Sequence, residues 1–308
     1  MNKVIGRYAP SPSGALHLGN IATSLLTWLD VRSNGGTLVF RMEDLDPDRS
    51  SVKYALQIAD DLRFLGLDWD IGWNAEPTSE YAQSNRSKLY DDIFNMLLSR
   101  DMLYPCYCSR SQRLAASAPH PDEHTYDAGC RCRYLSKLER AELEKSGRRP
   151  AWKVKAPDKE ISFTDLHYGF HRENLINSGD FIIKRSDGVY AYQLAVSFDD
   201  MDMGINRVVR GRDLLSSTAR QIWLISELGG KAPEYCHTPL LISEDKKKMS
   251  KRDGALSMVE LKQQYSAEEL IGLLAAHLNI GTGKPASALD LLSNFNWNCV
   301  PKSDIIIK

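Results

Sequence analysis

The chain has 308 residues, a length that predicts roughly two domains and is ample for a buried core. Hydrophobic residues make up 43% and charged residues 26%, which excludes a disordered, collagen-like or low-complexity chain. The 39 Lys and Arg balance 40 Asp and Glu, so any binding of nucleic acid must use local basic patches and not the overall charge.

The chain has none of the sequence marks of a membrane or secreted protein. No uncharged apolar run approaches the ~18–20 residues that span a bilayer, and residues 1–6 contain no apolar signal-peptide core. We therefore expect a cytoplasmic protein with no membrane partner. In that reducing compartment the six cysteines would be thiols or metal ligands and not disulfides.

The first hundred residues alternate strand-like and helix-like segments. Residues 4–8 and 37–40 predict strands, and apolar side chains at helical spacing predict helices over 18–29 and 52–65. Asn34-Gly35-Gly36 is a stop signal for the first helix. This order predicts an α/β fold with a parallel sheet, whose ligands bind beyond the carboxyl ends of the strands.

The alternation breaks after a third predicted helix at residues 86–99. Residues 105–150 contain four of the cysteines with several Pro and Gly, which indicates an insertion with its own local core. Alternating apolar and charged residues then predict strands at 152–155 and 181–184. Further elements are expected as a strand at 207–211 and helices that include 219–225 and 270–278, followed by a weakly patterned tail.

A Pro/Ser/Gly loop at residues 9–14 separates the first strand from the first helix. A helix N-terminus presents free N–H groups and a positive dipole end, which suits an anion. Gly14 and Gly19 would let a ligand approach the backbone closely. An ordinary βα loop explains the same residues equally well.

A basic run at residues 246–252, Lys-Lys-Lys-Met-Ser-Lys-Arg, could form a second anion site. Five cations within seven residues repel one another unless they are solvated or face an anion. A solvated surface run is the alternative interpretation.

Together the two motifs resemble the class I aminoacyl-tRNA synthetases. His17-Leu18-Gly19-Asn20 is similar to the HIGH motif of that family, and residues 248–252 are similar to its KMSKS motif. Each departs in its last residue, with Asn20 in place of the second His and Arg252 in place of Ser.

This resemblance implies amino-acid activation, in which a carboxylate attacks the α-phosphate of ATP to give an aminoacyl adenylate and pyrophosphate. The reaction needs two anions held in line and the phosphate charge stabilised. The resemblance implies His17, Lys248 and Lys251 as catalytic residues. It implies ATP binding by His17, Gly19, Asn20 and Lys251, with Mg²⁺ accompanying the nucleotide.

The amino-acid pocket resembles the glutamyl and glutaminyl branch of the family, on residues 7–14 and 41–46. Arg7 would form a bidentate pair with a side-chain carboxylate, and Glu43 would pair with the substrate ammonium. A structural ion pair of Arg7 with Glu43 or Asp44, and core packing of Tyr192, are the alternatives. The resemblance implies a glutamate site formed by Arg7, Tyr8, Ala9, Pro10, Ser11, Glu43, Tyr192 and Arg210.

Only residues 253–308 follow the lysine run, which is too little for the anticodon-binding domain of glutamyl-tRNA synthetases. The chain therefore resembles the glutamyl-Q tRNA(Asp) synthetase family. That implies tRNA-independent activation of L-glutamate and transfer to the queuosine base at the wobble position of tRNA-Asp, by a monomer. The alternatives are a glutamyl-tRNA synthetase without that domain and a catalytically silent tRNA-binding paralogue.

The resemblance also implies a domain organisation: a Rossmann-like class I catalytic domain with a zinc-binding insertion, a short C-terminal helical region and no anticodon-binding domain. The expected boundaries are 1–104 and 180–252 for the two catalytic halves, 105–179 for the acceptor-domain-like insertion, and 253–308 for the C-terminal region.

The cysteines of the insertion form two C-x-C pairs, a pattern that favours a structural Zn²⁺. Spacing alone proposes all four: Cys106, Cys108, Cys130 and Cys132. The resemblance instead implies Cys106, Cys108, Tyr126 and Cys130, and we expect this set. His120 and His124 are further candidates, and four unliganded thiols are the alternative.

Overall fold

The computed structural model describes residues 3–108, 130–243 and 257–307. Its first part is a parallel sheet in the order β1-β2-β3. The helix α1 (Leu18–Ser33) joins the first two strands, and α2 (Val52–Phe64) follows the second. The strands are β1 (Ile5–Tyr8), β2 (Thr37–Phe40) and β3 (Ile71–Gly72). The predicted βαβα order is confirmed.

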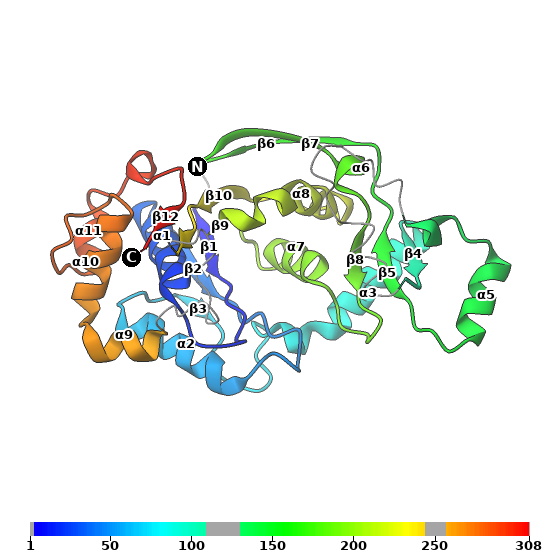
Figure 1. Ribbon diagram of the computed structural model, residues 1–308, viewed down its shortest axis with the longest axis horizontal. Helices are drawn as coiled ribbons and strands as arrows, with labels where there is room; N and C mark the ends of the chain where they lie inside the picture. The colour runs from blue at the N-terminus through cyan, green and yellow to red at the C-terminus, as the bar shows by residue number, and fades with distance from the viewer. Residues whose placement is uncertain (1–2, 109–129, 244–256, 308) are drawn as a thin grey trace.

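A second parallel pair, β9 (Arg207–Gly211) and β10 (Glu234–Thr238), forms a separate two-stranded sheet next to the first. The strand β9 lies beside β1, where Asn206 N–H donates to Ile5 O at 3.0 Å (Figure 1). The helices α7 (Tyr192–Asp202) and α8 (Thr218–Glu227) belong to this half. Chain segments about 200 residues apart thus place two parallel sheets side by side, as in doubly wound α/β folds.

The region between the two halves forms two antiparallel sheets. One has the order β4-β5-β8, and the other is the hairpin β6-β7 (Figure 1). The strands are β4 (Leu103–Cys106), β5 (Ala151–Val154), β6 (Glu160–Asp165), β7 (Gly169–Asn174) and β8 (Phe181–Lys184). The helices are α3 (Ser87–Ser99), α5 (Lys137–Lys145) and the short α6 (Leu175–Ser178). The expected strands at 152–155 and 181–184 are confirmed.

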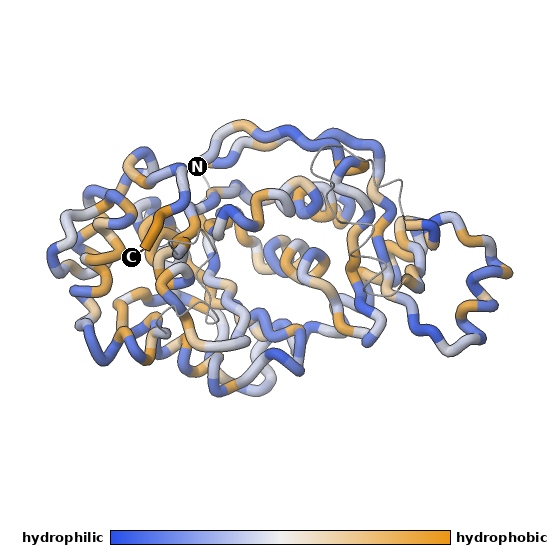
Figure 2. The backbone as a smooth tube through the Cα atoms, in the orientation of Figure 1, coloured by the Kyte–Doolittle hydropathy of each residue, from blue (hydrophilic) through white to orange (hydrophobic). Residues whose placement is uncertain are grey.

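Two large apolar clusters form the core. One joins α1 to the C-terminal helices, with Ile21 and Leu25 packed in the same cluster as Leu270 and Leu274. The other joins α3, α7 and α8 to the antiparallel β4-β5-β8 sheet. Figure 2 shows the matching pattern, with apolar segments around α1 and α10 and mostly hydrophilic residues along the β6-β7 hairpin.

The C-terminal segment consists of α9 (Met258–Gln264), α10 (Ala267–His277), α11 (Ala288–Leu292) and β12 (Ile305–Ile306). The strand β12 pairs in parallel with β11 (Leu241–Ile242). Asp304 accepts a hydrogen bond from Leu240 N–H at 3.1 Å and forms an ion pair with Arg212. The weakly patterned tail therefore contacts Leu240, a residue that lines the cavity described below.

Among the described residues, no helix combines the length and the apolarity that crossing a bilayer requires.

Candidate active site

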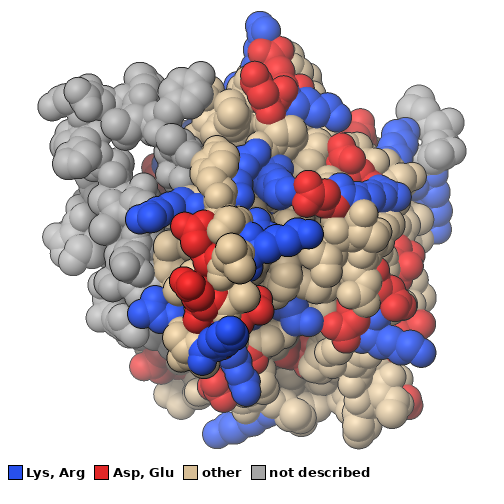
Figure 3. All heavy atoms as spheres, turned by 90° about the vertical axis from the view of Figure 1, so that its right-hand side faces the viewer, with Lys and Arg blue, Asp and Glu red and all other residues tan. Residues whose placement is uncertain are grey.

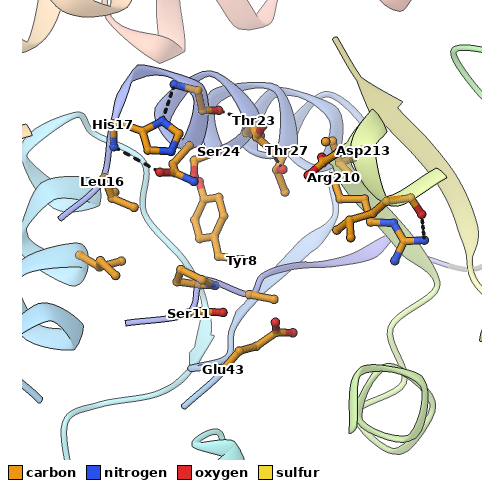
Figure 4. A pocket seen from close by; sticks show the side chains of 18 of the residues that line it. Tyr8, Ser11, Leu16, His17, Thr23, Ser24, Thr27, Glu43, Arg210 and Asp213 are labelled. Atoms are coloured by element: carbon orange, nitrogen blue, oxygen red, sulfur yellow. Dashed lines mark hydrogen bonds between the residues drawn. The ribbon is translucent and has the colours of Figure 1, made fainter. Parts of the chain in front are cut away.

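A cavity of about 810 Å³ opens where β1, β2 and β9 end (Figure 4). The eight residues expected to bind glutamate all line it, as do His17, Gly19 and Asn20. They come from the end of β1 and the loop after it, the start of α1, the segment after β2, the start of α7 and the end of β9. The structure thus assembles in one place every expected glutamate or ATP residue within its described part.

Arg210 is 4% exposed, and its partners are all neutral. Its Nε donates to His237 Nε2 at 3.0 Å and its Nη1 donates to Gln221 Oε1 at 2.6 Å. Its Nη2 donates to Thr218 Oγ1 at 2.9 Å and to the carbonyl oxygen of Leu214 at 3.3 Å. Among the described residues, no carboxylate lies within the 4.0 Å of an ion pair with Arg210. A buried cation that no carboxylate contacts directly is costly, so this cavity wall favours a ligand carboxylate.

Arg7 is also buried, but its charge is shared within the protein. Its Nε lies 3.3 Å from Asp200 Oδ1, and its Nη1 donates to Val209 O at 3.1 Å. The same Asp200 oxygen accepts from Arg41 Nη1 at 2.8 Å, and Arg41 Nη2 donates to Glu43 Oε1 at 3.1 Å. The result is a buried network of charged groups, which reaches the cavity through Arg7 and Glu43 and extends to Asp199, 4.0 Å from Arg41 Nε.

The alternative interpretation of Arg7 expected an ion pair with Glu43 or Asp44. Arg7 does form an ion pair, but its partner is Asp200. Asp44 instead accepts hydrogen bonds from Ser84, at 2.9 Å from the backbone N–H and 2.7 Å from the hydroxyl. Asp200, on α7, is the residue that sequence reasoning missed. The signal was available, because Asp199 and Asp200 are adjacent acids within a helix whose other side chains are largely apolar.

Glu43 is the carboxylate of this network that lines the cavity, and its Oε1 accepts a hydrogen bond from Arg41. Burial raises the pKa of this carboxyl above its ordinary value, although the guanidinium groups of Arg41 and Arg7 oppose that shift. A cation placed beside Glu43 would favour its ionised form. The geometry is therefore suited to an ammonium group.

His17 and Asn20 begin α1 with a capping box. The Nδ1 of His17 accepts from Gly19 N–H at 3.2 Å, and Asn20 Oδ1 accepts from His17 N–H at 3.2 Å. In neutral His17 the proton then lies on Nε2. The departure from the family motif at Asn20 thus has a structural reason, since a short amide side chain completes the cap.

Lys248 and Lys251 lie outside the described residues. The chain before them lines the cavity, and the chain after them contacts residues that line it. Leu241 lines it before the gap, and after the gap Ser257 forms a β-bridge with His17. Met258 N–H also donates to Leu16 O at 2.9 Å.

The cysteines of the insertion form a compact cluster, in which four Sγ atoms lie within 4.8 Å of one another. Cys130 Sγ lies 3.5 Å from Cys106 Sγ and 3.3 Å from Cys108 Sγ, and Cys108 Sγ lies 3.7 Å from Cys132 Sγ. Four thiolates around Zn²⁺ at about 2.3 Å would be separated by about 3.8 Å, so the donor set fits this ion. None of these cysteines lines the cavity.

The fourth member of this cluster is Cys132, which the expected ligand set omitted. Tyr126, His120 and His124 lie outside the described residues, so the expectation of Tyr126 stays a prediction. Burial raises the pKa of the Cys106 thiol to about 11. A bound Zn²⁺ would therefore have to displace protons from the cluster.

Three comparisons agree with this architecture. Residues 3–277 match the family model of tRNA synthetases class I (E and Q), catalytic domain. A glutamyl-Q tRNA(Asp) synthetase of Symbiobacterium thermophilum is 42% identical over 98% of this chain and 95% of its own length. One of Nitratidesulfovibrio vulgaris is 44% identical over 88% of this chain and 85% of its own length.

Among solved structures, a glutamate tRNA ligase of Elizabethkingia meningosepticum, in complex with its amino acid, superposes with a TM-score of 0.81. It is 26% identical, and the match covers all of this chain and 67% of the other. The expected class I catalytic fold is confirmed. The chain belongs to the family of class I tRNA synthetases (E and Q).

Proposed function

We propose that this chain activates L-glutamate with ATP and Mg²⁺, without tRNA, and transfers glutamate to the queuosine base at the wobble position of tRNA-Asp. The observation that carries the proposal is the buried Arg210, whose direct hydrogen-bond partners are all neutral, in one cavity with Arg7 and Glu43. The names of the relatives at 42% and 44% identity support the same acceptor.

In the first step, a carboxylate oxygen of glutamate attacks the α-phosphorus of ATP, and the bond to the bridging oxygen breaks to release pyrophosphate. Arg7 and Arg210 would hold the two carboxylates of the substrate, and Glu43 would hold its ammonium group. Tyr192 and residues 8–11 complete the pocket wall. Fixing the substrate in line can contribute about 7–11 kcal/mol to such a reaction.

On the nucleotide side, the proton on His17 Nε2 is suited to an α-phosphate oxygen, and Gly19 and Asn20 border the same part of the cavity. Lys248 and Lys251 would neutralise the phosphates, since the chain before them lines the cavity and the chain after them contacts residues that line it. Mg²⁺ would be held mainly by phosphate oxygens and water. In the second step, a hydroxyl oxygen of the queuosine base would attack the glutamyl carbonyl carbon, the bond from that carbon to the phosphate oxygen would break, and AMP would leave as the hydroxyl proton is lost.

The proposal is tested by glutamate-dependent ATP–pyrophosphate exchange without tRNA, followed by charging assays. We expect exchange without tRNA, and glutamate transfer to tRNA-Asp that carries queuosine but not to the same tRNA without it. Charging of tRNA-Glu would indicate a glutamyl-tRNA synthetase instead. Absence of exchange at saturating glutamate, ATP and Mg²⁺, both without tRNA and with either tRNA added, would indicate the silent paralogue.

We further propose that the protein acts as a monomer. We also propose that it acts in the cytoplasm, where ATP and tRNA are available. The end of the molecule formed by the insertion carries interspersed basic and acidic side chains (Figure 3). Arg131, Arg148 and Arg149 are exposed in this part of the chain and are candidate phosphate contacts. Sedimentation of the chain with and without tRNA-Asp tests the stoichiometry.

The cysteine cluster is proposed to hold one structural Zn²⁺ through Cys106, Cys108 and Cys130. The observed geometry favours Cys132 as the fourth ligand, and the resemblance favours Tyr126. We expect Cys132→Ser to lower the bound zinc of the purified protein, measured by atomic emission, and Tyr126→Phe to retain it. The reverse pattern would assign the ligand to Tyr126, and Cys299→Ser, at an exposed cysteine, is the matched control.

The raised pKa of Glu43 predicts a pH dependence of glutamate binding. Only the ionised carboxylate pairs with the ammonium group, so the KM for glutamate should rise as the pH falls. The rise should begin above the ~4.3 at which an exposed glutamate titrates. In Glu43→Gln the KM for glutamate should be higher at every pH and should not rise further as the pH falls. Asp44→Asn, at a residue outside the cavity lining, should keep the rise at low pH. If the KM of Glu43→Gln rose at low pH as it does in the wild type, Glu43 would not be the group that binds the ammonium.

A further inference from the structure

Two buried side chains, His237 and Asp165, are linked to Arg210 by consecutive hydrogen bonds. The Nε of Arg210 donates to His237 Nε2 at 3.0 Å, and His237 Nδ1 lies 2.6 Å from Asp165 Oδ2. His237 and Asp165 are fully enclosed, with 0% and 1% exposure. The centroid of the Tyr235 ring lies 5.0 Å from the Arg210 guanidinium carbon and 6.2 Å from the centroid of the His237 ring, to which it is nearly parallel, at 12°. Neither His237 nor Asp165 lines the cavity.

Asp165 is itself fixed as an acceptor. Its Oδ1 accepts from the backbone N–H groups of His167 at 3.0 Å and Tyr168 at 2.8 Å. Its Oδ2 accepts from His237 N–H at 3.1 Å. Burial acts to raise the pKa of Asp165, but these donors and the imidazole together lower it below its ordinary value. The residue ends β6, so it is supplied by the inserted region and not by either of the two parallel sheets.

The partners on the two sides of His237 determine its tautomer. Arg210 is a donor only, so His237 Nε2 must be an acceptor, and a carboxylate accepts only, so Nδ1 must bear the proton. Burial lowers the pKa of His237, which agrees with a neutral ring. A proton on Nε2 would instead point at the Arg210 N–H and push the guanidinium out of place.

We propose that Asp165 and His237 are positioning residues that orient the Arg210 guanidinium for the substrate carboxylate. Asp165 holds the His237 proton on Nδ1, and the neutral imidazole then fixes the direction of Arg210 Nε–H. Nη1 also donates to Gln221 and Nη2 to Thr218 and Leu214, so of the five N–H groups one, on Nη1, is left for a ligand at the cavity wall that Arg210 lines. This inference rests on the proposed function of Arg210 in glutamate binding.

Three variants test the Arg210–His237 and His237–Asp165 hydrogen bonds separately. His237→Asn places an amide near the old Nδ1 and keeps a partner for Asp165, but removes the acceptor of Arg210. His237→Gln places an amide oxygen near the old Nε2 and keeps that acceptor. Asp165→Asn retains an oxygen for the backbone donors and turns an NH₂ group toward Nδ1, which forces the proton onto Nε2, as in the Asp→Asn change of a serine protease triad.

The experiment measures KM for glutamate and for ATP, with kcat, in pyrophosphate exchange by the full chain. We expect His237→Asn and Asp165→Asn to raise the KM for glutamate about tenfold or more while the KM for ATP stays near the wild-type value. His237→Gln should recover most of the loss. His277→Asn, the same substitution at a residue that does not line the cavity, should behave as wild type.

An unchanged KM for glutamate in His237→Asn would overturn the inference, and so would equal rises in both KM values with no recovery in His237→Gln. The ¹⁵N imidazole spectrum of the wild-type protein is a second test that needs no variant to fold and no activity. We expect a neutral His237 protonated on Nδ1, and a proton on Nε2 or on both nitrogens would overturn the inference. Loss of exchange in the wild type itself would contradict only the proposed function.

Discussion

Replacing Lys251 with alanine is expected to reduce glutamate-dependent pyrophosphate exchange by about 10²–10³-fold or more, because it removes a cation that meets charge developing on the phosphates. The effect should fall on kcat more than on the KM for glutamate, since the ammonium group acts where phosphate charge grows in the transition state. Steady-state exchange at varied ATP and glutamate measures both constants.

Lys247→Ala is the matched control for this prediction, because it removes one positive charge from the same basic run. If both variants lost activity equally, the run would act as a general positive field. If neither did, Lys251 would have no role in catalysis. A selective loss in Lys251→Ala supports the assignment of a defined lysine to the phosphates.

Replacing Arg7 with alanine is expected to raise the KM for glutamate by about 10²-fold or more, the effect of removing one partner from a buried hydrogen-bonded charge pair. Arg7 faces the cavity with only part of its charge offset, because Asp200 is shared with Arg41. The KM for ATP should change little. Glutamate titrations in the exchange assay measure the shift.

Arg7→Lys tests the geometry of this site separately from its charge. Lysine keeps one positive charge but cannot present two parallel N–H donors to a carboxylate, so we expect an intermediate KM. Arg63→Ala, at an exposed arginine on α2, is the control for loss of a guanidinium. Thermal unfolding of each variant identifies any loss of stability from leaving Asp200 with fewer partners. A glutamate KM in Arg7→Ala equal to that of wild type would remove Arg7 from the pocket.

The cavity residues could be found from the sequence because they lie in short motifs next to strand and helix boundaries. Arg7 and His17 belong to one strand-loop-helix segment, and Glu43 follows the next strand. Local periodicity placed those boundaries, and the parallel arrangement brings the carboxyl ends of neighbouring strands together.

The residues that hold those side chains in place could not be found in this way. Asp200 lies 193 positions from Arg7, and Asp165 lies 72 positions from His237. A lone buried aspartate or histidine carries no periodic signal, and its partner is chosen by the path of the chain. The four-cysteine cluster is an intermediate case, since spacing proposed all four thiols but only the fold shows Cys132 beside the other three.

The sequence by itself determined the alternation of strands and helices, the position of the cavity at the strand ends, and the chemical types of the groups that line it. These follow from local backbone preferences and from motifs only a few residues long. Tertiary structure alone decided that Asp200 offsets Arg7 whereas Arg210 is left with neutral partners. The physical reason is that the charge balance of a buried group depends on which distant side chains share its low-dielectric surroundings.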